Sequence, residues 1–151
     1  MNILLNDNNF SGTIRDGFES FRNLDFADFS SNQLTGTLPG SIFNIRDLRF
    51  LYLSKNGLQG PLPDNWANAV LLRDLFLDYN QLSGTIPEIT GGAFTRLTEL
   101  LLNGNMFTGQ MPGSICQLRS SAILEDLWAD CGSNPPRIRC ALPSCCTFCF
   151  E

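Results

Sequence analysis

Residues 48–63 read LRFLYLSKNGLQGPLP, and residues 72–87 repeat the same pattern as LRDLFLDYNQLSGTIP. In both stretches an asparagine is followed four residues later by a glycine and is preceded by leucines at alternating positions. Equivalent asparagines recur every 24 or 25 residues: Asn8, Asn32, Asn56, Asn80 and Asn105. A fixed period of this length indicates a repeat protein in which each unit forms one coil.

The residues around each asparagine predict a short strand that ends in a turn. Apolar residues stand five and three positions before it in every repeat, which is the period-2 pattern of a strand with one buried face. The asparagine amide can hydrogen-bond to backbone groups that the turn leaves unpaired. The glycine permits a tight backbone path, and the proline that follows in most repeats suits an extended segment outside the sheet.

Later apolar pairs in each unit, such as Ile42 and Ile45, predict a helical or 3₁₀-like turn that returns the chain to the interior. One coil buries its leucines only against a neighbouring coil, so the coils are expected to stack. We therefore predict an α/β solenoid: a right-handed coil with a parallel sheet of short strands on its concave face. The convex side is expected to be 3₁₀, helical or irregular. Residues 1–123 should form about five repeats, and residues 124–151 a last strand with a cysteine-rich cap.

The consensus Leu-x-x-Leu-x-Leu-x-x-Asn-x-Leu-x-Gly-x-Ile/Leu-Pro resembles the plant-type leucine-rich repeat, and the resemblance covers roughly residues 1–118. Residues 124–131 and the cysteines after them resemble the C-terminal cap of secreted and receptor-like repeat proteins of algae. Two features depart from the family. An N-terminal cap with paired cysteines is absent from the sequence, and repeat four carries an extra residue near Thr90, which predicts a small bulge on the convex side.

The composition restricts the class of partner and the compartment. A net charge of −5 disfavours nucleic acid and anionic membranes as partners, and no apolar run is long enough to span a bilayer. Five of the six cysteines lie in the last 21 residues, which indicates disulfides and hence an extracellular or cell-surface protein. The sequence does not open with the basic and apolar segments of a signal peptide, so we expect a fragment of a longer protein.

Every cysteine is a disulfide candidate: Cys116, Cys131, Cys140, Cys145, Cys146 and Cys149. The pair Cys146-x-x-Cys149 also occurs in redox and zinc sites. The sequence lacks both the thioredoxin-like context and the two short knuckles of a four-cysteine zinc site, so no metal is expected. Neighbouring Cys145 and Cys146 should take different partners, because a bridge between them would be strained. Cys116 is either a bridge to the cap or a buried thiol, and the 15 possible pairings stay open.

An outward column, four residues before each asparagine, is unusually apolar for a solvated surface. Contiguous exposed aromatic area usually marks an interface. We therefore predict ligand contacts on the concave face at Tyr52, Phe76, Leu101 and Trp128, which Phe26 and Phe50 would widen. The next outward columns are polar and add the candidates Asp78 and Tyr79. The alternative is that the aromatic side chains pack on one another or on flanking chain.

The resemblance implies a protein-binding or peptide-binding module of a receptor-like or secreted protein. The sequence contains no histidine and no phosphate-binding loop, so we expect no enzyme activity and no cofactor. A kinase domain, as some relatives have, would lie outside these residues. The alternative function is a structural subunit held permanently in a hetero-complex. Asn9-Phe10-Ser11 is a candidate N-glycosylation site at Asn9, although the repeat itself explains the serine.

Overall fold

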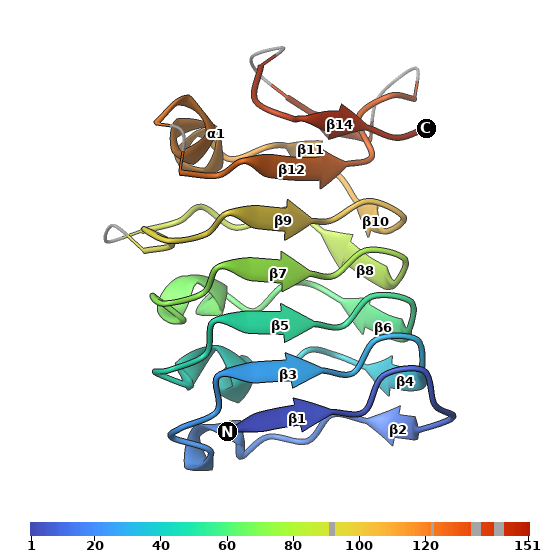
Figure 1. Cartoon of the computed structure of the whole chain (residues 1–151). Coiled ribbons are helices and arrows are strands. Elements are labelled where there is room, and N and C mark those ends of the chain that lie inside the picture. Colours follow the sequence, from blue (N-terminus) through green and yellow to red (C-terminus); the bar gives the residue numbers. More distant parts are fainter. Residues whose placement is uncertain (91–92, 122, 134–136, 141–143) are drawn as a thin grey trace.

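The computed structural model describes residues 1–90, 93–121, 123–133, 137–140 and 144–151. Successive coils stack in chain order from the N-terminal strand β1 to the last strand β14 (Figure 1). This stacking of parallel strands confirms the predicted α/β solenoid. In the described part of the chain, no helix is both long enough and apolar enough to cross a membrane.

Seven parallel strands form the main sheet, in the order β1-β3-β5-β7-β9-β12-β14. They are β1 (Asn2–Leu4), β3 (Phe26–Asp28), β5 (Phe50–Tyr52), β7 (Asp74–Phe76), β9 (Glu99–Leu101), β12 (Asp126–Ala129) and β14 (Phe148–Cys149). The middle residues of the strands pair in register from coil to coil, and those of β5, β7 and β9 are fully buried leucines. Each strand therefore turns one face to the core and the other outward, as the period-2 pattern predicts.

A second parallel sheet lies after the asparagine turns, where the sequence predicted only a turn and an extended segment. Its strands are β2 (Ser11–Thr13), β4 (Gln33–Gly36), β6 (Gly57–Gly60), β8 (Gln81–Gly84) and β10 (Met106–Phe107). From β4 onward each strand buries one apolar side chain, such as Leu58 or Leu82. A further parallel pair, β11 (Gly109–Gln110) with β13 (Ile138–Arg139), joins the last repeat to the cap.

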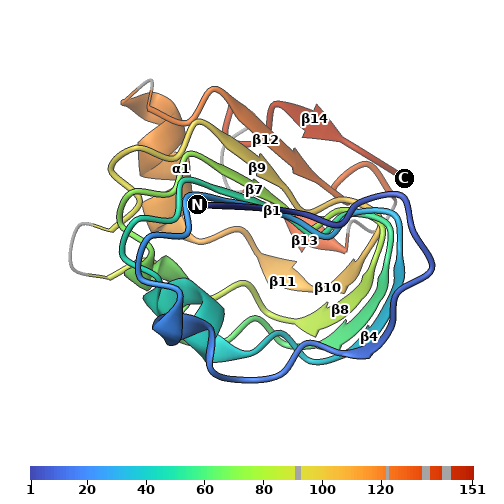
Figure 2. The ribbon, with the colours of Figure 1, turned by 60° about the horizontal axis from the view of Figure 1, so that its bottom comes forward.

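Short helical turns occupy the third side of the coil, as predicted. They are the 3₁₀ helices η1 (Phe18–Ser20), η2 (Gly40–Asn44) and η3 (Trp66–Asn68), and the α-helix α1 (Gly113–Ser120). Figure 2 shows that the two sheets and these turns surround the interior. Trp66 and Phe94 are fully buried there, with ring centroids 5.1 Å apart. The bulge expected near Thr90 includes residues 91 and 92, which lie outside the described residues.

The predicted asparagine ladder is confirmed. Asn80 donates from Nδ2 to the carbonyl oxygens of Leu53, Leu77 and Asp78, at 3.0, 3.1 and 3.3 Å. Its Oδ1 accepts the Leu58 backbone N–H at 3.1 Å. Each asparagine from the second repeat onward bridges two coils in this way, while Asn8 donates only within its own coil.

Two positions of each turn adopt the left-handed backbone conformation. The residue before each of the first four ladder asparagines has φ between 53° and 55°, although its identity varies between aspartate, serine, lysine and tyrosine. The glycine four residues after the asparagine also has a positive φ, as in Gly60 and Gly84. Both positions favour glycine because of their positive φ, but the repeat keeps glycine consistently only at the position four residues after the asparagine.

Gly84→Ala is expected to lower the free energy of unfolding by about 1–2 kcal/mol, the cost of a Cβ in left-handed backbone. Gly84 has a φ of 83°, and its nearest obstacle to a Cβ is the Pro61 Cβ at 3.6 Å, so crowding contributes little. Urea unfolding gives the value. The matched control is Gly113→Ala, whose φ is ordinary and whose Cβ would meet open space. Equal stability of the two variants would contradict the role of the positive φ.

Candidate functional site

An apolar row crosses the outward face of the main sheet. We use this name for Tyr52, Phe76, Leu101, Trp128 and Phe148, which occupy equivalent positions on neighbouring strands. The first four side chains are partly buried, and Phe148 is 49% exposed. The structure therefore brings together four of the predicted ligand contacts, and the cap adds a fifth residue that the sequence did not indicate.

Aromatic contacts hold the two ends of this row. Tyr52 stacks on Phe76, with ring centroids 4.4 Å apart and planes at 7°. Phe26 packs against both Phe50 and Tyr52, at 5.7 and 5.1 Å between centroids. At the other end Trp128 contacts Phe148 at 5.0 Å and Phe150 at 5.4 Å. The aromatic side chains thus pack on one another and still leave part of their surface open. Their role as ligand contacts stays a prediction.

An acidic row runs beside the apolar row. It consists of Asp74, Glu99 and Asp126, which pair in register on strands β7, β9 and β12. The three side chains are partly buried. Asp74 accepts hydrogen bonds from the Tyr52 hydroxyl at 3.1 Å and the Thr98 hydroxyl at 3.0 Å. Carboxylates on adjacent strands lie about one strand spacing, ~4.8 Å, apart in the backbone and repel one another.

Burial, together with this crowding of charge, raises the pKa of two groups on the face. Burial raises the pKa of Glu99 above its ordinary value, and the nearby carboxylates of Asp74, Asp126 and Glu125 add to the rise. Burial also raises the pKa of the Tyr52 phenol, with a further contribution from Asp74. The Tyr52 hydroxyl therefore stays protonated as a hydrogen-bond donor at physiological pH.

Glu99→Gln is expected to stabilise the protein at pH 7 by up to about 0.5 kcal/mol, because it removes a disfavoured charge. The folded state binds the Glu99 proton at a higher pH than the unfolded chain does. As pH falls from 7 through the raised pKa toward the ordinary value of about 4.3, the wild type should therefore gain stability relative to the variant. Urea midpoints of both proteins across this range measure the difference. A difference that stays constant with pH would contradict the raised pKa.

The predicted outward position of Asp78 is wrong. Its residue is 7% exposed, and Oδ1 accepts a hydrogen bond from the Ser54 hydroxyl of the preceding coil. Strand β7 ends at Phe76, so the alternation of side chains has stopped before residue 78. Tyr79, in contrast, is 53% exposed. Asn103 and Asp130, in the same column as Asp78, are also buried.

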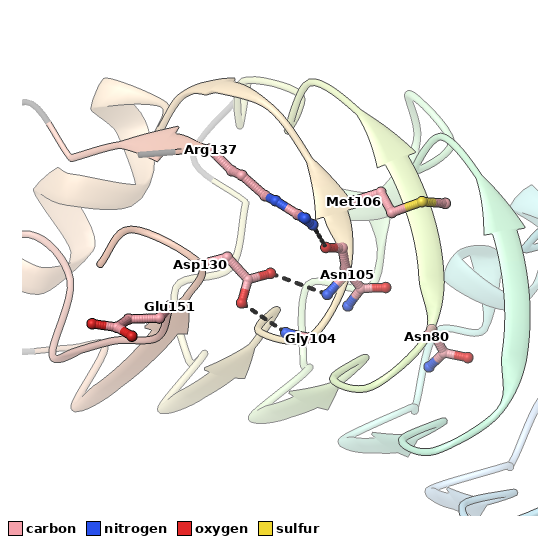
Figure 3. A pocket seen from close by; sticks show the side chains of 7 residues that line it. All are labelled: Asn80, Gly104, Asn105, Met106, Asp130, Arg137 and Glu151. Carbon is pink, nitrogen blue, oxygen red and sulfur yellow. Dashed lines mark hydrogen bonds between the residues drawn. The ribbon is translucent and has the colours of Figure 1, made fainter. Parts of the chain in front are cut away.

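The cap replaces the asparagine turn with two side chains (Figure 3). The Asp130 carboxylate accepts the backbone N–H groups of Gly104 and Asn105 at 2.8 and 3.0 Å, and Arg137 donates to the Asn105 carbonyl oxygen at 3.1 Å. In earlier turns backbone carbonyls of the next coil accept the equivalent N–H groups, as those of Asp78 and Tyr79 accept from Lys55 and Asn56. A hollow of about 270 Å³ lies among these residues, Met106 and Glu151. The hydrogen bonds of Asp130 and Arg137 close the end of the solenoid.

All six cysteines, each within the described part of the chain, form disulfides. The pairs are Cys116–Cys145, Cys131–Cys149 and Cys140–Cys146. The expectation of disulfides and of different partners for Cys145 and Cys146 is confirmed, and Cys116 is a bridge to the cap. The sulfur atoms of Cys131, Cys140 and Cys146 lie within 4.8 Å of one another, a spacing that could suit a metal. As disulfides they offer no thiolate to a zinc ion.

The glycosylation candidate Asn9 is exposed on the first coil, and its Oδ1 accepts a weak hydrogen bond of 3.5 Å from Gln33. Its modification stays a prediction. The same coil leaves the apolar side chains of Leu4 and Phe10 exposed, at 63% and 48%.

Comparisons with known proteins agree with this architecture. The Leucine Rich Repeat family model matches residues 23–45, 47–69, 71–93 and 96–118, which together make up more than half of the chain. Among curated protein sequences, none matches.

Solved structures of plant receptor ectodomains share the fold. The ectodomain of the receptor kinase GASSHO1/SCHENGEN3 from Arabidopsis thaliana, solved with CASPARIAN STRIP INTEGRITY FACTOR 2, is 32% identical with a TM-score of 0.78, over 92% of this chain and 16% of that one. The Arabidopsis receptor kinase HAESA, solved with the peptide hormone IDA and the co-receptor SERK1, is 30% identical with a TM-score of 0.76, over 85% and 21%.

A shorter neighbour is in the BIR3–SERK2 complex from Arabidopsis thaliana, which is 30% identical with a TM-score of 0.72, over 92% of this chain and 72% of that one. The chain thus spans about a sixth of the first of these receptor ectodomains and most of the last. The repeat matches, the stacked parallel strands and the asparagine ladder lead to one conclusion: the chain belongs to the leucine-rich repeat family.

Proposed function

We propose that this chain is a non-enzymatic recognition module that binds a protein or peptide on the outward face of its main sheet. The observation that carries the proposal is the apolar row, which crosses five neighbouring strands and stays partly exposed throughout. Rigid aromatic side chains in such positions dominate the binding energy of interfaces. The strands hold them in fixed positions, so little conformational entropy is lost when a ligand binds.

Two further observations support the compartment and the type of ligand that we propose. The three disulfides suit an oxidising compartment, and this supports a secreted or cell-surface location for the module. Structural neighbours include the receptor kinase HAESA, which was solved with a peptide hormone. We extend the peptide-binding role from that protein to this chain.

The test is selection of a random peptide library, displayed on phage, against the immobilised chain. Selected peptides are then titrated against wild type and Phe76→Ala. Phe76→Ala should weaken binding about tenfold or more, the effect of losing one aromatic anchor. The control is Val70→Ala, at a 49% exposed residue outside the sheets, which should bind as wild type does.

Two results would contradict the proposal. One is that no peptide is enriched, and the other is that every enriched peptide binds Phe76→Ala as tightly as wild type. If the chain were isolated from its source in a stable hetero-complex that covers the apolar row, the structural-subunit alternative would replace the proposal.

A further inference from the structure

The chemistry of the sheet face is asymmetric across three strands. Asp74, Glu99 and Asp126 lie two positions before Phe76, Leu101 and Trp128 in strands β7, β9 and β12. Residues two apart in a strand share a face, so each carboxylate is the neighbour of one apolar side chain. The paired registers repeat this arrangement on all three strands. The acidic row and the apolar row therefore run parallel across this half of the sheet.

Within the described residues, the charge of the acidic row is not neutralised. Neither Glu99 nor Asp126 accepts a side-chain hydrogen bond or forms an ion pair there, and Asp74 accepts only from two neutral hydroxyl groups. The nearby cation Arg49 is paired with Asp25, while Arg73 forms no ion pair with a described carboxylate. An apolar ligand on this face would remove water from unpaired carboxylates, which is costly unless the ligand brings a cation.

We propose that the ligand of this face is a cationic amphipathic segment, in which lysine or arginine side chains face the acidic row and apolar side chains lie on Phe76, Leu101 and Trp128. This inference rests on the proposed function and specifies the class of ligand. The negative charge of the acidic row favours a basic peptide over an acidic one, and its unpaired carboxylates disfavour a purely apolar one. The net charge of −5 adds a long-range attraction for the same partner.

The spacing of the rows also defines the direction and pattern of the segment. Both rows cross the strands, so a ligand that follows them lies along the axis of the solenoid. Three strands span about 10 Å, which an extended chain covers with about three residues. Successive side chains of an extended segment point to opposite sides. The minimal pattern is therefore basic–apolar–basic or apolar–basic–apolar.

Two synthetic peptides of identical composition test this pattern: one alternates lysine and leucine, and the other has all its lysines before its leucines. A third peptide alternates glutamate and leucine. Fluorescence anisotropy at low ionic strength should show that the alternating lysine peptide binds about tenfold more tightly than the block peptide, and that the glutamate peptide does not bind. Equal affinity for the two lysine peptides would overturn the inference.

A protein variant provides the complementary test. Glu99→Gln with Asp126→Asn removes two carboxylates from the acidic row, keeps the side-chain shapes and should weaken binding of the alternating lysine peptide about tenfold. The matched control, Asp47→Asn with Asp64→Asn, removes two exposed carboxylates outside the sheets and should change affinity less than about twofold. Equal losses in the two variants would mean that only net charge matters, and the inference would fail.

The phage selection separates this inference from the proposed function. Selected peptides that depend on Phe76 but carry no excess of lysine or arginine would overturn the inference and leave the proposed function standing. If none of the selected peptides depends on Phe76, both fail. Enrichment of alternating basic and apolar residues, lost when the library is selected against the Glu99→Gln/Asp126→Asn variant, is the expected result.

Discussion

Asn80→Ala is expected to lower the free energy of unfolding by about 3 kcal/mol. Asn80 is 7% exposed, and its side chain makes four hydrogen bonds, of which those with Leu53 and Leu58 join it to the preceding coil. Its loss removes the acceptor that Asn80 Oδ1 provides for the N–H of the fully buried Leu58. A buried donor without a partner costs more than the mean value of a hydrogen bond. Urea unfolding monitored by circular dichroism measures the change.

The matched control is Asn8→Ala at the exposed end of the same ladder. Asn8 makes two hydrogen bonds within its own coil, to the carbonyl oxygens of Leu5 and Asn6, and bridges no second coil. Its replacement should cost less than about 1 kcal/mol. Hydrogen exchange adds a local measurement, because the Leu58 amide should lose protection in Asn80→Ala and keep it in Asn8→Ala. Equal costs at the two positions would contradict the stabilising role of the bridge between coils.

The coil and its ladder could be predicted from the sequence because the pattern repeats five times at nearly constant spacing. One repeat alone would leave the strand and the asparagine turn ambiguous, since a short apolar run fits either a strand or a helix. Repetition removes the ambiguity, because only stacked coils place Asn32, Asn56 and Asn80 at one edge of a sheet.

The second sheet could not be predicted in the same way. Strands such as β6 and β8 are four residues long, and each buries a single apolar residue, Leu58 or Leu82. One buried position gives no period, and the glycine at the end of each strand usually indicates a turn. These strands form because the main sheet already sets the spacing of the coils, so their backbone groups meet those of the next coil.

The outward face was predicted correctly inside the strands and only in part beyond their ends, where Tyr79 is exposed but Asp78 is not. Tyr52 and Phe76 lie inside strands and point outward, whereas Asp78 follows the end of β7 and is buried against Ser54. Strand ends are the least certain part of a sequence-based assignment, because alternation depends on extended backbone. The acidic row is a different case. Outward carboxylates look the same in a sequence whether they are scattered solvated charges or lie in register, and only the pairing of β7, β9 and β12 shows that Asp74, Glu99 and Asp126 form a row.

Disulfide pairing depends on distances that only the folded cap defines. Cys116 lies in α1 and Cys145 follows β13, yet both are buried at the end of the core, with Cα atoms 4.9 Å apart. The sequence could show that the cysteines cluster but not which of them meet. The pairing in turn determines how much each bridge stabilises the cap, because bridges close loops of different length.

Replacing both cysteines of the Cys116–Cys145 bridge with alanine is expected to lower the free energy of unfolding by about 3–4 kcal/mol. The two residues are 29 positions apart, and the chain-entropy relation gives this value for a loop of that length. Both sulfur-bearing residues are also buried, so the variant loses packing at the core end. Guanidinium unfolding under non-reducing conditions measures the loss.

The control is the Cys140–Cys146 bridge, whose partners are six positions apart and whose removal should cost about 2 kcal/mol by the same relation. Thiol titration of the native protein should find no reactive cysteine before reduction, because every sulfur is paired. Free thiols together with bound zinc would contradict the disulfide assignment, and a larger loss for the shorter loop would contradict the entropic explanation. If both expectations hold, the disulfides stabilise the last coil by restricting the unfolded chain, and the cap also stabilises it by covering the core. The Cys131–Cys149 bridge and strand pairing hold β12 and β14 together, and this pairing fixes the position of Trp128 at the end of the apolar row.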